Sequence, residues 1–235
     1  MMKPYRVLLL MGLLCASAQT FAMGDDDPLV AKVMIDKLEL RSTDGPDSLV
    51  LDADAWIGHD LNKLWFKTEV ERVDGKTEEA ELQMLYSRAI APFWDLQLGW
   101  RRDIQPQPQR DYLALGFKGL APYLFEVDAS LFVGEAGQLG ARLDAEYEYL
   151  FTQRLVLTPE FEVNLHTKDD PEVDVGAGLS DLQLGLRVRY EIRREFAPYI
   201  GVNWIKQFGQ TADYARAEGG DTSDIQLVAG IRAWF

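Results

Sequence analysis

Most of the chain alternates between apolar and polar residues with a period of two. In one segment, Leu49, Leu51 and Ala53 alternate with Asp52 and Asp54. Successive side chains of a strand point to opposite faces, so each segment has an apolar and a polar face. A helix would place its apolar positions three and four residues apart. The pattern predicts strands at residues 33–40, 49–58, 64–71, 79–86, 94–101, 112–117, 125–133, 139–149, 157–165, 181–191, 198–204 and 227–235.

The predicted strands are roughly ten residues long, which is the length that a tilted strand needs to cross a bilayer. Their connections alternate between short turns, at 58–62, 90–92, 119–122, 151–154 and 194–198, and longer polar loops, at 42–47, 103–109, 167–180 and 208–223. Three of the turns contain the sequence Ala-Pro-Phe or Ala-Pro-Tyr, at 91–93, 121–123 and 197–199. This weak repetition favours hairpins that follow one another in a single sheet.

A soluble β-sandwich and a membrane barrel both alternate in this way, but they use the polar face differently. Here the polar positions are charged along their whole length, aromatic residues gather near strand ends, and the last strand ends on Phe235. These features favour a barrel that turns its apolar face to lipid and its polar face to a wet lumen. We predict an all-β fold: a transmembrane antiparallel up-and-down β-barrel of 10–12 strands over residues 31–235, in the bacterial outer membrane.

The N-terminal residues have the composition of a secretory signal peptide. Lys3 and Arg6 precede an apolar run at 7–14, and small residues lead to a cleavage site after Ala22. We predict a signal peptide at 1–22 and a short periplasmic segment at 23–30. A lipoprotein interpretation at Cys15 is disfavoured by the bulky Leu14 before it. Cleavage would remove the single cysteine, so the exported protein is expected to fold without disulfides.

The chain is strongly acidic, with a formal net charge of −14 over 235 residues. This charge argues against nucleic acid as a partner. The alternation directs an excess of acids into the lumen, where they attract cations or pair with bases as an inert filling; both alternatives stay open. The acids include Asp52, Asp54, Glu69, Glu81, Glu126, Asp128 and Glu146, and the bases include Arg101, Arg142, Arg187 and Arg189.

Metal ligands and catalytic groups are scarce. After the signal peptide the only histidines are His59 and His166. His166 with Asp169 and Asp170 has the donors of a weak copper(II) site, although a solvated polar loop explains the same residues. A lipid hydrolase is the enzymatic alternative, with Ser180 as nucleophile near His166, but the sequence lacks Gly-x-Ser-x-Gly. We predict that the protein is not an enzyme.

Several long runs resemble the copper resistance protein B family, and the resemblance extends from Asp27 to Phe235. The runs are Asp52–Gly58, Leu85–Asp95, Gly119–Tyr123, Phe125–Ala129, Gly178–Asp181 and Arg189–Trp204. The resemblance implies an outer-membrane β-barrel that works in copper tolerance, with copper ions as ligand and a periplasmic multicopper oxidase as partner. A general narrow cation channel, or a structural barrel without copper preference, is the alternative.

The chain departs from this family in one place. Many members carry a long segment rich in Met, His and Asp between the signal and the barrel, where this sequence has only Met23–Asp27. We therefore expect any contact with metal to fall in the lumen or the loops. No ligand residue of the family is carried over.

Overall fold

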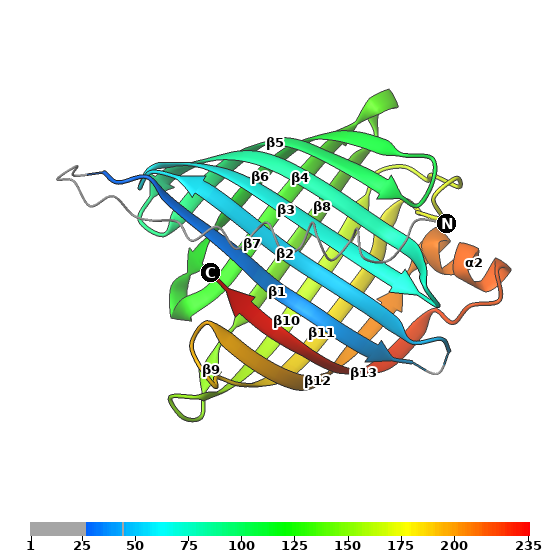
Figure 1. Cartoon of the computed structure of the whole chain (residues 1–235). Helices are drawn as coiled ribbons and strands as arrows, with labels where there is room; N and C mark the ends of the chain where they lie inside the picture. The colour runs from blue at the N-terminus through cyan, green and yellow to red at the C-terminus, as the bar shows by residue number, and fades with distance from the viewer. Residues whose placement is uncertain (1–26, 44) are drawn as a thin grey trace, which may run out of the picture.

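The computed structural model describes residues 27–43 and 45–235, which form one antiparallel sheet closed into a barrel (Figure 1). Each strand pairs with its neighbours in the chain, and β1 pairs with β13 to close the ring. β8 and β9 both pair with β10, one after the other, so the thirteen strand segments make twelve positions around the barrel. The predicted fold class is confirmed, with twelve strands.

The observed strands overlap every segment that the alternation predicts. They are β1 (Val30–Ser42), β2 (Ser48–Gly58), β3 (Asn62–Val73), β4 (Lys76–Ala91), β5 (Trp94–Gln105), β6 (Arg110–Ala121), β7 (Phe125–Gly134), β8 (Leu139–Tyr147), β9 (Tyr149–Leu150), β10 (Leu155–His166), β11 (Gly178–Tyr190), β12 (Phe196–Gln207) and β13 (Ser223–Trp234). Two short 3-10 turns, η1 (Pro122–Leu124) and η2 (Glu135–Gly137), connect strands at opposite ends of the barrel.

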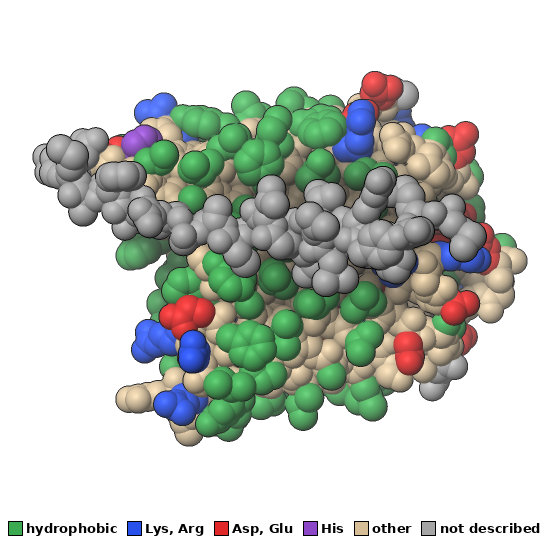
Figure 2. All heavy atoms as spheres, in the orientation of Figure 1, with side chains coloured by type: hydrophobic (Ala, Val, Ile, Leu, Met, Phe, Trp, Pro, Cys, Tyr) green, Lys and Arg blue, Asp and Glu red, His purple; other side chains and the backbone are tan. Residues whose placement is uncertain are grey.

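Apolar side chains cover the outer wall of the barrel, and charged side chains gather at its two ends (Figure 2). Ile200, Ile225 and Leu227 are each more than three-fifths exposed, on neighbouring strands β12 and β13. Meanwhile Glu39, Gln97 and Arg187 are almost completely buried. Apolar residues outside and polar residues inside are the reverse of the arrangement in a soluble protein. This arrangement is stable only where the barrel is surrounded by hydrocarbon, because lipid offers no hydrogen bonds and favours an apolar wall.

The predicted short turns and the C-terminus lie at one end of the barrel; the predicted longer loops lie at the other end, together with the two-residue turn between β3 and β4 (Figure 1). Two expectations about these connections are wrong. The turn expected at 194–198 is shorter than predicted, because Phe196, Ala197 and Pro198 belong to β12, in which Tyr199 is buried in the lumen. The stretch 208–223, expected as a loop, contains the helix α2 (Gly209–Ala217), because Thr211 and Ala212 find a packing surface at the barrel mouth.

A bulge in β1 changes which side chains enter the lumen. The pairing register of β1 shifts between Ile35 and Lys37 against β2, and between Ile35 and Leu38 against β13. An extra residue at such a shift is left out of the ladder. As a result, the adjacent residues Asp36 and Lys37 both line the lumen.

The predicted signal peptide at 1–22, and residues 23–26 of the segment at 23–30, lie outside the described residues. Within the part of the chain that the structure describes, no helix has the length and apolar character needed to cross a membrane.

Candidate functional site: the charged lumen

The lumen contains two cavities of about 460 Å³ each, one toward the short turns and one toward the long loops. We call them the turn-side cavity and the loop-side cavity. Among the described residues, eleven carboxylates and seven basic groups line the turn-side cavity, and nine carboxylates and five basic groups line the loop-side cavity. Both cavities therefore carry an acidic excess.

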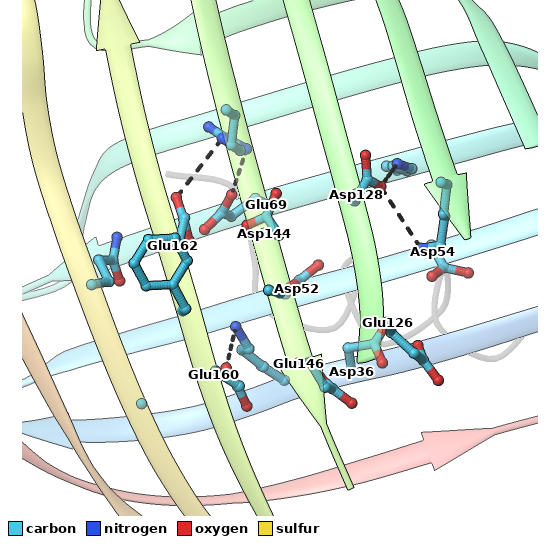
Figure 3. Close-up of a pocket in the computed structure, with 18 of the residues that line it drawn as sticks. Asp36, Asp52, Asp54, Glu69, Glu126, Asp128, Asp144, Glu146, Glu160 and Glu162 are labelled. Atoms are coloured by element: carbon cyan, nitrogen blue, oxygen red, sulfur yellow. Dashed lines mark hydrogen bonds and ion pairs between the residues drawn. The ribbon is translucent and has the colours of Figure 1, made fainter. Parts of the chain in front are cut away.

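Every acid that the sequence assigned to the lumen lines the turn-side cavity, where Figure 3 shows most of them pointing inward. They are Asp52, Asp54, Glu69, Glu81, Glu126, Asp128 and Glu146. The predicted basic counterparts also face the lumen: Arg101 lines the loop-side cavity, Arg142 lines both cavities, Arg187 lines the turn-side cavity, and Arg189 lines a small pocket beside it.

Many of the lumenal bases reach carboxylates on the far side of the barrel. Lys67 Nζ on β3 lies 2.6 Å from Asp128 Oδ2 on β7, and Lys37 Nζ on β1 lies 3.0 Å from Glu160 Oε2 on β10. Three strands separate the partners in each case. These ion pairs cross the lumen and leave it divided, so the interior is partly filled, as expected for a barrel between the closed eight-stranded and open sixteen-stranded sizes.

Four carboxylates of the turn-side cavity make no ion pair with any described residue: Asp52, Asp54, Glu126 and Asp144. Asp54 is only 8% exposed, and its Oδ1 atom has no hydrogen-bond partner. A buried polar atom without a partner is unfavourable unless another group satisfies it. The cavity thus holds four carboxyl groups that form no ion pair with the described bases.

The sequence reading missed the lumenal residues of β1 and several others. Asp36, Lys37, Lys118 and Arg232 all line the turn-side cavity. The period of two in β1 was visible at Lys37, Glu39 and Arg41, but the bulge at Asp36 breaks the phase of the strand. A phase break of one residue is therefore the signal for Asp36 and Lys37, whereas Lys118 and Arg232 follow the ordinary alternation of β6 and β13.

Glu39 lies at the centre of the best-connected polar network of the wall. Its carboxylate accepts hydrogen bonds from Arg41 Nε (2.7 Å), Arg187 Nε (3.0 Å), Arg187 Nη2 (2.8 Å) and the Tyr199 hydroxyl (2.9 Å). Arg187 Nη1 also lies 2.7 Å from Glu160 Oε2. The network joins β1, β10, β11 and β12 and has a structural role, because each charged group is matched within the protein.

The three residues of the suggested copper(II) site are engaged in separate contacts. His166 Nδ1 lies 2.8 Å from Ser180 Oγ, Asp169 accepts a hydrogen bond from the Ala177 amide, and Asp170 pairs with Arg110. Within the described residues, no group of three or more His, Cys, Asp or Glu side chains is placed to hold a metal ion. The copper(II) site at His166 stays a prediction without support from the geometry.

The contact between Ser180 and His166 also bears on the lipid-hydrolase alternative. The Ser180 hydroxyl donates to the Gly176 carbonyl oxygen at 3.1 Å, so His166 Nδ1–H must be the donor in its contact with Ser180. A catalytic pair needs the histidine to accept the proton of the serine. In this structure the hydrogen bond runs from His166 to Ser180, which is the opposite of what a catalytic pair requires.

Arg110 fastens the loop between β10 and β11 over the mouth of the loop-side cavity. Its Nε atom lies 3.0 Å from Asp170 Oδ2, and its Nη2 atom lies 2.7 Å from Glu172 Oε2. Burial opposes ionisation of Asp170, but hydrogen bonds from Arg110 and Gln138 outweigh it and hold the pKa of this carboxyl below its ordinary value. The loop is thus held by a charged clamp that needs an ionised Asp170.

A closed antiparallel barrel with a lipid-facing apolar wall and a charged lumen defines an outer-membrane protein of porin-like architecture. The NanC porin has the same fold, with a TM-score of 0.58 at 11% identity over 87% of this chain and 99% of its own. The KdgM porin gives a TM-score of 0.52 at 10% identity over 88% and 99%. At these identities the likeness concerns the fold alone.

The family follows from the sequence comparisons. The model of the family described as Copper resistance protein B precursor (CopB) matches residues 29–235, and the chain belongs to this family. Copper resistance protein B of Escherichia coli is 45% identical over 203 residues, which are 86% of this chain and 69% of the relative. A copper resistance protein B homolog of Pseudomonas syringae pv. tomato is 42% identical over 210 residues, 89% and 71% of the two chains. The predicted family and the outer-membrane location are confirmed.

Proposed function

We propose that this barrel acts in copper homeostasis by admitting copper ions to its acidic lumen, where they are held weakly and passed between the two cavities. The observation that carries the proposal is the set of lumenal carboxylates without basic partners, with the orphaned oxygen of Asp54 among them. Such a surface concentrates cations and excludes anions.

The donor set favours loose binding of copper(II) over tight binding of copper(I). The lumenal donors are mainly carboxylate oxygens, whereas copper(I) prefers thiolate or thioether sulfur. No preformed cluster of three ligands occurs among the described residues. We therefore assign to the lumen a role in passage and not in storage. A periplasmic multicopper oxidase, expected from the resemblance, would receive or supply the ion at the short-turn end.

The proposal is tested by copper flux into lipid vesicles that contain the refolded barrel and a trapped copper(II)-quenched dye. The variant Asp52→Asn/Asp54→Asn should slow the flux severalfold, because it removes two carboxyl groups from the turn-side cavity. Asp74→Asn is the matched control, since Asp74 lies in an exposed turn outside the lumen with a positive φ of 48° that asparagine tolerates.

A second readout separates this proposal from a general cation channel. Sodium and copper(II) currents are compared in planar bilayers, together with copper tolerance and cell copper content of a strain that lacks the gene. Equal permeation of the two ions with unchanged copper tolerance would favour the general channel. No permeation of either ion would favour the structural barrel.

A further inference from the structure

The turn-side and loop-side cavities meet at a layer of charged side chains in the middle of the lumen. Residues that line both cavities include Glu69, Glu81, Phe132, Arg142 and Glu162. They come from β3, β4, β7, β8 and β10, which are spread over more than half of the barrel. Anything that moves between the cavities must pass this layer.

Arg142 crosses the lumen at this level. From β8 it reaches Glu81 Oε2 on β4 at 3.1 Å and Glu69 Oε2 on β3 at 3.5 Å, while its Nε atom lies 3.8 Å from Glu162 Oε1 on β10. Its side chain is 18% exposed. A single guanidinium group thereby ties three strands across the open cross-section, as the planar fork of arginine allows.

Arg101 completes the layer from β5. Its Nη2 atom lies 2.8 Å from Glu81 Oε2, its Nε atom lies 2.7 Å from Asp103 Oδ1, and its guanidinium lies 4.3 Å from the centre of the Phe132 ring. Glu81 thus receives both arginines. At this distance from the ring the guanidinium makes a cation–π contact with Phe132, which itself lines both cavities.

We propose that Arg101 and Arg142 form a bridge that closes the middle of the lumen and sets the barrier that a cation must cross between the two cavities. The obstruction is steric, because Arg142 reaches across the lumen and Arg101 meets it at Glu81 from β5. The electrostatics of the same layer still favour cations, since Glu69, Glu81, Glu162 and Asp103 outnumber the two arginines. A passing cation can replace a guanidinium group as the partner of these carboxylates while the arginine side chain changes its rotamer.

This inference rests on the proposed function, because it names the step that limits passage through the same lumen. It also goes further, because it assigns that step to two residues of one layer. An inert filling would contain the same ion pairs, but their loss would then change stability and leave ion flow unaffected.

The test is single-channel conductance in planar bilayers with potassium chloride as the probe. Arg142→Ala and Arg101→Ala should each raise the conductance about tenfold, which corresponds to lowering the barrier by about 1.4 kcal/mol. In a salt gradient, the reversal potential of both variants should shift toward stronger cation selectivity, because carboxylates are left unpaired. Arg142→Met, which keeps most of the bulk, should stay close to the wild type in conductance.

Arg102→Ala is the matched control. Arg102 follows Arg101 on β5, but it points to the outer face, where its Nη2 atom lies 2.8 Å from Asp111 Oδ2. Its loss should leave conductance unchanged. If Arg142→Ala fails to fold, as judged by heat-dependent migration on gels, Arg142→Ala/Glu162→Gln replaces it and leaves one charge fewer unpaired.

Folded variants with wild-type conductance would overturn the inference, and so would an equal rise in Arg102→Ala. The two proposals can fail separately. If the wild type passes copper and the arginine variants behave like it, only the bridge is wrong. If the variants open the lumen but no form of the protein passes copper in preference to sodium, only the copper role is wrong.

Discussion

Replacing Glu39 by glutamine removes the negative charge on which two arginines and a tyrosine converge. The side chain of Glu39 is 0% exposed, and its four hydrogen bonds come from Arg41, Arg187 and Tyr199. Glutamine keeps the volume, but its amide group presents a donor to other donors. Both arginines would then lack their shared counter-charge in a wall that water barely reaches.

The cost can be worked from these contacts. Removing one partner of a buried ion pair typically destabilises a protein by about 3–5 kcal/mol. Arg187 keeps Glu160 at 2.7 Å, which offsets part of the loss, so we expect Glu39→Gln to lower the free energy of unfolding by about 3 kcal/mol. Tyr199→Phe removes only one donor and should cost about 1–2 kcal/mol.

The assay is guanidinium unfolding of the barrel in lipid vesicles, followed by tryptophan fluorescence, with the loss taken from the shift in midpoint at constant slope. Glu195→Gln, at an exposed turn position, is the control and should stay within about 0.5 kcal/mol of the wild type. A Glu39→Gln barrel as stable as this control would refute the reasoning, because the network would then contribute nothing beyond its exposed counterparts.

Two further predictions concern the loop clamp and strand packing. Because the pKa of Asp170 is held below its ordinary value, the stabilisation by Arg110 is present above about pH 4 and is lost as the pH falls through the lowered pKa. The protection of residues 167–177 against hydrogen exchange, taken relative to the intrinsic exchange rate at each pH, should therefore fall below about pH 4, and in Asp170→Asn it should be low at neutral pH as well; protection in the wild type that does not change with pH would contradict this. Gly99→Ala should destabilise the barrel by about 1–3 kcal/mol in the same unfolding assay, because a Cβ atom there would collide with the backbone of β4. Gly116→Ala, whose Cβ would meet a side-chain hydroxyl at 3.1 Å, should cost less, and equal losses would argue against the backbone collision.

The strands and their faces could be predicted from the sequence because a barrel wall separates two very different solvents. Each strand must place apolar residues toward lipid and polar ones toward the lumen, so the period of two recurs around the barrel and is interrupted in β1 by the bulge. Asp54, Asp128 and Arg142 could be placed in the lumen for this reason alone. The alternation carries no information, however, about which charges meet across the barrel.

The misplaced features are those in which tertiary contacts override the local pattern. Asp36 forms a bulge, and a bulge inserts one residue without changing composition. Ala197 begins an Ala-Pro-Tyr stretch that repeats the sequence of two turns, but this stretch lies in β12, where the hydroxyl of Tyr199 donates to Glu39. Helix α2 forms where a polar loop was expected, because Thr211 hydrogen-bonds to the Gly176 amide.

The pairing of β1 with β13 has a consequence for assembly. Met34 faces Trp234 in this ladder, and the amides and carbonyls of Val33 and Phe235 bond to each other. β1 and β13 are the first and the last strand of the barrel, so the barrel cannot close until β13 is in place. Every earlier intermediate exposes two free edges that hydrocarbon cannot satisfy. Insertion must therefore end with the pairing of β1 and β13. A mutation that prevents this pairing should leave an open sheet and not a smaller barrel.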